Sequence, residues 1–130
     1  MVSKDYYNNC ISDYRGQILD NNHTIEVLEN KKIEVTNRKR ENEQYLTERI
    51  ISISKLQSAN SEGVRIYGEQ LIPEVSPGKA SSILSNYDDI NSAIDRKIQQ
   101  LSDENSQLVN QISSCQDEIS RIEMEEQEKK

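Results

Sequence analysis

An apolar residue recurs every three or four positions through the last third of the chain. The series is Ile83, Tyr87, Ile90, Ile94, Ile98, Leu101, Asn105, Leu108, Ile112, Cys115, Ile119 and Ile122, with one asparagine among its members. This spacing is typical of the inward positions of a coiled coil. Polar and charged residues fill the intervals, so only a narrow strip can be buried. The strip predicts a long helix that packs against one or two other helices.

Composition agrees with a helical protein that has a large exposed surface. Hydrophobic residues make up 33% of the chain and charged residues 30%, and there is no Phe or Trp around which a globular core could form. Disordered chains lack a sustained apolar period, and this one has it. Its 130 residues suffice for a single domain.

Charge and hydropathy exclude several classes of partner. The formal net charge of −7 disfavours nucleic acids and anionic lipid surfaces. A local basic run at Lys31, Lys32 and 38–40 is interpreted as a solvated helix face. No apolar stretch approaches the ~20 residues of a bilayer span, so membrane insertion is not expected. The first residues contain no apolar signal segment, which predicts a cytoplasmic protein, or one that is secreted by a non-classical route.

A second helical pattern covers residues 5–60. Its apolar residues are Tyr7, Ile11, Tyr14, Ile18, Ile25, Leu28, Val35, Leu46, Ile50, Ile53 and Leu56. This stretch contains no Pro and a single Gly, which a long helix tolerates. If one register is kept throughout, four polar residues also fall at inward sites: Asn21, Lys32, Lys39 and Asn42.

Helix continuity is expected to end in residues 61–78, which hold three of the four glycines and both prolines. This connection can form a short helix, a compact turn or a small β-hairpin. A turn motif of Ser76, Pro77 and Gly78, with Ser76 as a helix cap, leads into a second long helix at 79–126.

The expected fold is therefore all-α, a long antiparallel helical hairpin that forms one elongated domain. A turn in the low seventies would place Asn42 opposite Asn105, and such a buried pair often sets helix register. The steps of four between Ile90, Ile94 and Ile98 predict a local repeat of eleven residues, which unwinds a supercoil.

No residues form a recognisable catalytic or cofactor site. Motifs for zinc proteases, serine hydrolases and phosphate-binding loops are absent, and His23 is the single histidine. Adjacent carboxylates lie on positions that face solvent, where no pocket can raise a pKa. Cys10 and Cys115 are far apart in sequence, so neither a disulfide nor a metal role is expected. We expect no enzyme activity and no cofactor.

A hairpin of two helices leaves part of its apolar surface uncovered, which points to a protein partner. Tyrosines are enriched at interfaces but can also cap the ends of a hairpin, and both interpretations remain open. The candidate partner-binding residues are Tyr7, Ile11, Tyr14, Ile50, Ile51, Leu84, Tyr87, Ile90, Ile94 and Val109.

The segments Ile72-Pro73-Glu74, Pro77-Gly78-Lys79-Ala80 and Tyr87-Asp88-Asp89-Ile90 precede a regular Ile/Leu helix. This layout resembles the YwqH-like family of small helical proteins encoded beside LXG toxins in Gram-positive bacteria. Ser76-Pro77-Gly78 stands where that family shows a W-x-G-like element. None of the six tyrosines is followed four residues later by Asp or Glu, as a YxxxD/E export signal requires.

The resemblance implies a targeting chaperone that binds the helical domain of an LXG toxin, alone or with a second small helical protein. It would promote export of the toxin by a type VII secretion system. A self-associating coiled-coil tether, present as a homodimer, is the first alternative. A prefoldin-like chaperone with a β-hairpin at 64–75 is the second.

Overall fold

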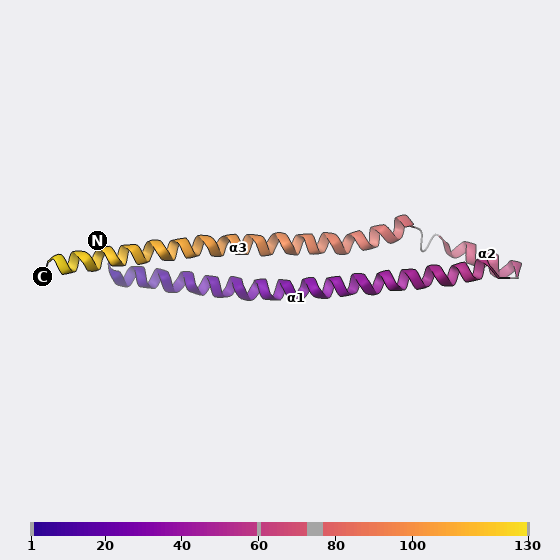
Figure 1. The fold of residues 1–130 in the computed structure, drawn as a ribbon, viewed down its shortest axis with the longest axis horizontal. Coiled ribbons are helices and arrows are strands. Elements are labelled where there is room, and N and C mark those ends of the chain that lie inside the picture. The colour runs from indigo at the N-terminus through magenta and orange to yellow at the C-terminus, as the bar shows by residue number, and fades with distance from the viewer. Residues whose placement is uncertain (1, 60, 73–76, 130) are drawn as a thin grey trace. The chain divides into compact units, whose positions relative to one another are not determined.

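The computed structural model describes residues 2–59, 61–72 and 77–129, and over these ranges it contains three helices and no strand. The helices are α1 (Lys4–Gln57), α2 (Glu62–Leu71) and α3 (Pro77–Glu128), as Figure 1 shows. The two long helices pack against each other, which confirms the predicted all-α hairpin.

The expected helix boundaries are close to those observed. α1 was expected at 5–60 and α3 at 79–126, and both differ from these bounds by at most three residues. The open question of the connection is answered by α2, since residues 64–71 are helical and cannot form the β-hairpin of the prefoldin-like alternative. Pro77 and Gly78 begin α3 and do not form a turn, while Ser76 lies outside the described residues.

Local sequence explains how each helix begins. The Ser3 hydroxyl accepts a hydrogen bond from the Tyr6 amide at 3.2 Å and so caps α1. The Ser61 hydroxyl accepts one from the Val64 amide in the same way and caps α2. Proline suits the first position of α3, because the amide that it lacks would have no helical partner there.

The chain forms two compact units, each of which contains parts of both long helices. The first unit comprises Met1–Glu29 and Asp95–Lys130. In it α1 and α3 run antiparallel, with the Lys4–Glu126 ion pair and the Asn21–Asn105 hydrogen bond between them, both 3.0 Å long. Among the described residues of this unit, the buried apolar side chains are Ile11, Leu101, Leu108 and Ile122.

The second unit, Asn30–Ile94, contains the remainder of α1 and α3 together with α2. α2 folds back along the end of α1, as Figure 1 shows. A Cβ built on Gly68 would lie 2.9 Å from Leu56 Cβ, so the two helices approach closely at this glycine. Ile53 and Ile94 are the buried apolar side chains among the described residues of this unit.

The expected pairing of Asn42 with Asn105 is wrong. In the first unit Asn105 accepts a hydrogen bond from Asn21 and donates one to Asn22 at 2.9 Å. In the second unit the Asn42 amide donates to the Tyr87 hydroxyl. The turn had been expected in the low seventies, whereas the chain already reverses between α1 and α2, which changes every pairing along the hairpin.

The eleven-residue repeat expected around Ile90 is also wrong. The less exposed residues of α3 recur in unbroken steps of three and four through Leu84, Tyr87, Asn91, Ile94 and Ile98. The inward residues of the two long helices form the seam of the hairpin. The regular heptad leaves Ile83 and Ile90 outside this seam, 38% and 48% exposed. Asn91, and not the more apolar Ile90, takes the inward position. A helix that keeps an unbroken heptad must place residue 91 there, whatever its polarity.

Candidate functional site

The structure divides the candidate partner-binding residues into three groups. Ile11 and Ile94 are buried in the cores of their own units. Tyr7, Tyr14, Leu84 and Tyr87 are half-buried on the inward faces of the helices. Ile50, Ile51, Ile90 and Val109 are exposed, so these four can meet a partner without any change in the hairpin.

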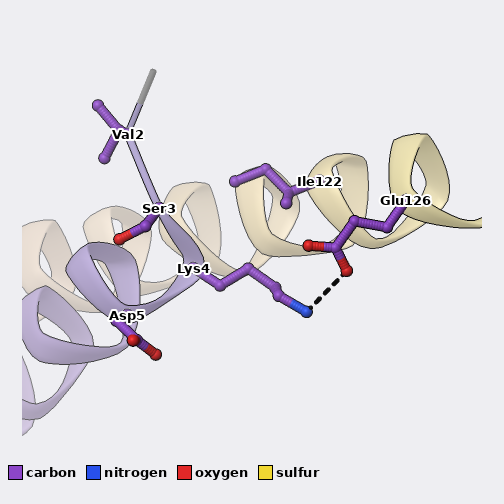
Figure 2. Close-up of a pocket in the computed structure, with 6 residues that line it drawn as sticks. All are labelled: Val2, Ser3, Lys4, Asp5, Ile122 and Glu126. Atoms are coloured by element: carbon purple, nitrogen blue, oxygen red, sulfur yellow. Dashed lines mark hydrogen bonds and ion pairs between the residues drawn. The ribbon is translucent and has the colours of Figure 1, made fainter. Parts of the chain in front are cut away.

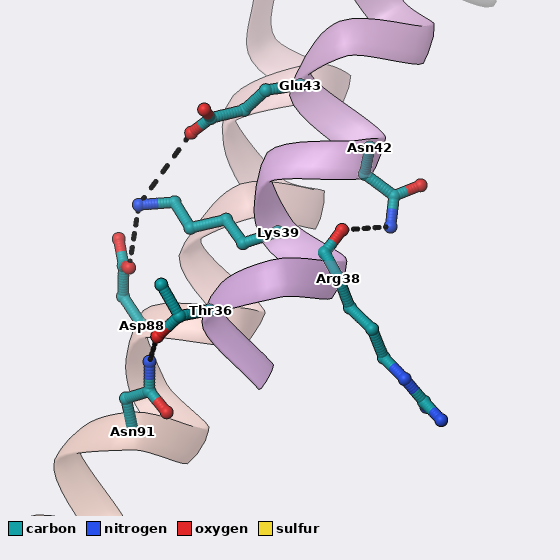
Figure 3. Close-up of polar contacts among 7 residues, drawn as sticks. All are labelled: Thr36, Arg38, Lys39, Asn42, Glu43, Asp88 and Asn91. Atoms are coloured by element: carbon teal, nitrogen blue, oxygen red, sulfur yellow. Dashed lines mark hydrogen bonds and ion pairs between the residues drawn. The ribbon is translucent and has the colours of Figure 1, made fainter. Parts of the chain in front are cut away.

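Polar residues occupy several inward positions of α1, as predicted. Asn21, Lys32, Lys39 and Asn42 are all half-buried, at the places that a continuous heptad assigns them. Lys39 Nζ lies 2.9 Å from Asp88 and 3.8 Å from Glu43. Figure 3 draws both contacts. The hydrogen bond from Lys39 to Asp88 raises the pKa of the lysine above its usual value. The seam of the second unit is thus held in part by polar contacts.

A second polar contact lies beside Lys39 in Figure 3. The Asn91 side-chain amide donates to the Thr36 hydroxyl at 3.2 Å. Its carbonyl oxygen is buried and has no hydrogen-bond partner within the part of the chain that the structure describes. A buried unpaired oxygen costs free energy, so this layer of the seam adds little stability to the second unit.

Three large side chains, which we call the side stripe, lie on one edge of the second unit. They are Tyr45, Ile83 and Ile90, which are 61%, 38% and 48% exposed. Each directly precedes an inward residue, namely Leu46, Leu84 or Asn91. In an antiparallel pair of helices, residues that precede the first inward position of each heptad share one edge. The Lys39–Asp88 and Thr36–Asn91 contacts belong to the opposite edge.

Exposed apolar residues are concentrated in the second unit. It contains ten of the sixteen exposed large hydrophobic side chains that the described residues include. Besides the side stripe these are Ile33, Ile50, Ile51, Val64, Ile66, Tyr67 and Ile72. Tyr45 is not among the partner-binding residues predicted from the sequence. A strict heptad counted from Tyr7 places it outside the seam, which is the signal that could have identified it.

The formal charge divides between the units just as unevenly. The sequence from 30 to 94 contains nine basic and nine acidic residues, so the net charge of −7 belongs to the other two segments. The second unit therefore carries no net formal charge. An acidic protein that approaches the first unit is repelled.

Two hollows on the described part of the surface, one in each unit, are open to solvent. One lies in the first unit and is lined by residues 2–5 near the start of α1 and by Ile122 and Glu126 of α3. Figure 2 shows the Lys4–Glu126 ion pair across it. The hydrogen bond to Glu126 raises the pKa of Lys4. The positive charge of this lysine is therefore paired with a carboxylate of the same chain.

Other kinds of site are missing from the described part of the chain. No group of three or more His, Cys, Asp or Glu side chains there could hold a metal ion. Within the same residues, neither long helix contains an apolar stretch of the length that a bilayer span needs. The apolar surface of the second unit is therefore the candidate functional site.

Comparisons of the chain with protein-family models, with curated proteins and with solved structures find no significant match. The resemblance to the YwqH-like family stays a prediction.

Proposed function

We propose that the chain is a non-enzymatic targeting chaperone that binds the helical domain of an LXG-type toxin and promotes its export by a type VII secretion system. The observation that carries this proposal is the concentration of exposed apolar side chains on the neutral second unit. A partner helix laid along the side stripe would bury Tyr45, Ile83 and Ile90 and complete a bundle.

The composition of the seam supports binding to another protein. Lys39, Asn42 and Asn91 take inward positions that apolar residues would fill in a self-sufficient coiled coil. A hairpin with so few buried apolar side chains gains stability when further helices cover it. The toxin class comes from the resemblance of the sequence to the YwqH-like family.

Co-expression with the helical domain of an LXG toxin from the same genome tests the proposal. We expect a stable complex in size-exclusion chromatography with light scattering, and a sharper thermal transition than that of the free chain. Ile83→Asp/Ile90→Asp should weaken binding at least ~10-fold, because covering each isoleucine contributes more than about 1 kcal/mol. Leu19→Asp/Val27→Asp, which changes two exposed apolar residues of the first unit, is the matched control and should bind normally.

Self-association is the competing outcome. The free chain would instead be a coiled-coil tether if it forms a stable homodimer with cooperative melting and does not bind the LXG domain. A gene placed among phage or cytoskeletal genes, with no LXG gene nearby, would also contradict the proposal.

A further inference from the structure

The two cysteines, which are distant in sequence, lie at the same level of the first unit. Asn21 donates to Asn105 across the hairpin at 3.0 Å. Ten residues before Asn21 is Ile11, and ten residues after Asn105 is Cys115. Both helices rise equally per residue, so Ile11 and Cys115 are level with each other. Cys10 directly precedes Ile11.

Both cysteines belong to the packed side of the helices. Cys10 and Cys115 are half-buried, and the neighbouring Ile11 is only 6% exposed. In a coiled coil an inward side chain enters a hole formed by four residues of the facing helix. For Cys115 the register makes that hole from Tyr7, Cys10, Ile11 and Tyr14. The two thiols are therefore neighbours.

The separation expected for such a pair suits a disulfide. Packed helix axes lie about 8–10 Å apart and each Cα lies ~2.3 Å from its axis, which puts directly facing Cα atoms at about 3–5 Å. Cys10 precedes the inward Ile11, so its Cα lies somewhat farther from that of Cys115 than a directly facing one would. Disulfides span Cα distances of about 4.4–6.8 Å. Burial raises the pKa of Cys115, and the nearby Cys10 thiol raises it further. Both thiols are free in this structure.

We propose that Cys10 and Cys115 form a redox pair that closes to an intrachain disulfide when the chain meets a small-molecule disulfide such as oxidised glutathione. The Cys10 thiolate attacks the oxidant, forms a mixed disulfide and releases one glutathione thiolate. Cys115 then loses its proton and attacks the Cys10 sulfur, and the second glutathione leaves. Two cysteine thiols are oxidised and one glutathione disulfide is reduced to two thiols.

The bond would join the start of α1 to the last third of α3 and close a loop of roughly 100 residues. It would lock the first unit and leave the apolar surface of the second unit unchanged. This inference goes beyond the proposed function, because it requires no toxin and no other partner.

Redox titration of the full chain with glutathione tests the pair. Free thiols are trapped with a maleimide, and intact mass and non-reducing electrophoresis then report the products. We expect a monomer that has lost two hydrogens. The effective concentration of the Cys10 and Cys115 thiols for each other, taken from the glutathione ratio at half oxidation, should be at least ~10-fold higher in native buffer than in urea. The reason is that the hairpin holds the two cysteines together. The disulfide form should melt at least ~5 °C above the reduced form.

The matched control is Cys10→Ser/Gln17→Cys. Gln17 lies seven residues along the same edge of α1, which moves the thiol ~10 Å from the level of Cys115. This variant should form no intrachain disulfide in native buffer, and its helicity by circular dichroism should match that of the parent chain. The proposal is overturned if the parent chain stays reduced, forms only interchain dimers, or cross-links no better than this control.

Discussion

At the scale of single residues, Asn105 shows how a polar side chain in the seam can align two helices. It accepts from Asn21 and donates to Asn22, so both of its polar groups are used. Moving α3 by one heptad would separate Asn105 from both partners. We therefore keep a register-setting role for Asn105 as a prediction, now with Asn21 and Asn22 as its partners. Asn42 keeps a similar predicted role through Tyr87.

Replacing one member of the Asn21–Asn105 pair should lower the free energy of unfolding more than replacing both. Asn105→Leu leaves the half-buried Asn21 amide without its acceptor, whereas Asn21→Leu/Asn105→Leu replaces the pair with apolar contact. We expect the double variant to be at least ~1 kcal/mol more stable than the single variant in urea unfolding. Exposed Asn110→Leu is the control and should change stability by less than ~0.5 kcal/mol. A single Asn105→Leu variant that only gains stability would contradict the register-setting role.

At the scale of elements, α2 is held by the approach of its backbone to the end of α1. Gly68 is buried there, and a methyl group in place of its hydrogen would meet Leu56 Cβ at 2.9 Å and the Gln57 amide at 3.2 Å. A larger residue must push the two helices apart. The glycine thus serves a close helix contact, although glycine weakens helices elsewhere.

Gly68→Ala should destabilise the second unit despite the better helix propensity of alanine. The clash should exceed the ~1 kcal/mol that alanine gains in a helix, so thermal stability should fall. Gly63→Ala in the same helix is the matched control. Its added methyl group has only an ordinary contact, 3.9 Å from Ser61 Oγ, so this variant should be neutral or stabilising. Circular dichroism melts of both variants give the comparison, and equal melting would exclude the close contact.

The face that α3 presents to α1 is a second property at this scale. The regular heptad makes Ile94 a core residue and leaves Ile90 at the surface, 48% exposed. Surface substitutions usually change stability by less than ~0.5 kcal/mol, while truncating a core isoleucine costs about 2 kcal/mol or more.

We therefore expect Ile90→Gln to leave urea unfolding of the free chain almost unchanged and Ile94→Ala to shift it strongly. If the two substitutions lower the free energy of unfolding equally, Ile90 belongs to the seam. That result would support the eleven-residue repeat.

At the scale of the whole molecule, the two units differ in core and in charge. Four of the six buried apolar side chains within the described ranges lie in the first unit, which also holds the net charge. The second unit has two, and polar residues share its seam. Binding surfaces are often drawn from the less stable parts of a protein, and the exposed apolar residues lie in this unit.

Hydrogen exchange should separate the two units. Amides in the helices of 30–94 should exchange faster than those of 4–29 and 95–128, because fewer apolar contacts oppose their opening. Mass spectrometry of peptic fragments measures this directly. The LXG domain should slow exchange in 30–94 selectively. Uniform exchange along the free chain would show that the units open together.

The sequence alone determined the helices and most of their inward faces. Each face follows from the period of its own helix, so even unfavourable inward residues such as Lys39 and Asn42 were predicted correctly. Apolar residues misled the prediction at Ile50, Ile83 and Ile90, where a regular heptad prevailed over hydrophobicity. Only the tertiary structure decided which residues meet across the hairpin. That alignment depends on where the chain reverses, and the heptad period is the same for every alignment shifted by a whole repeat.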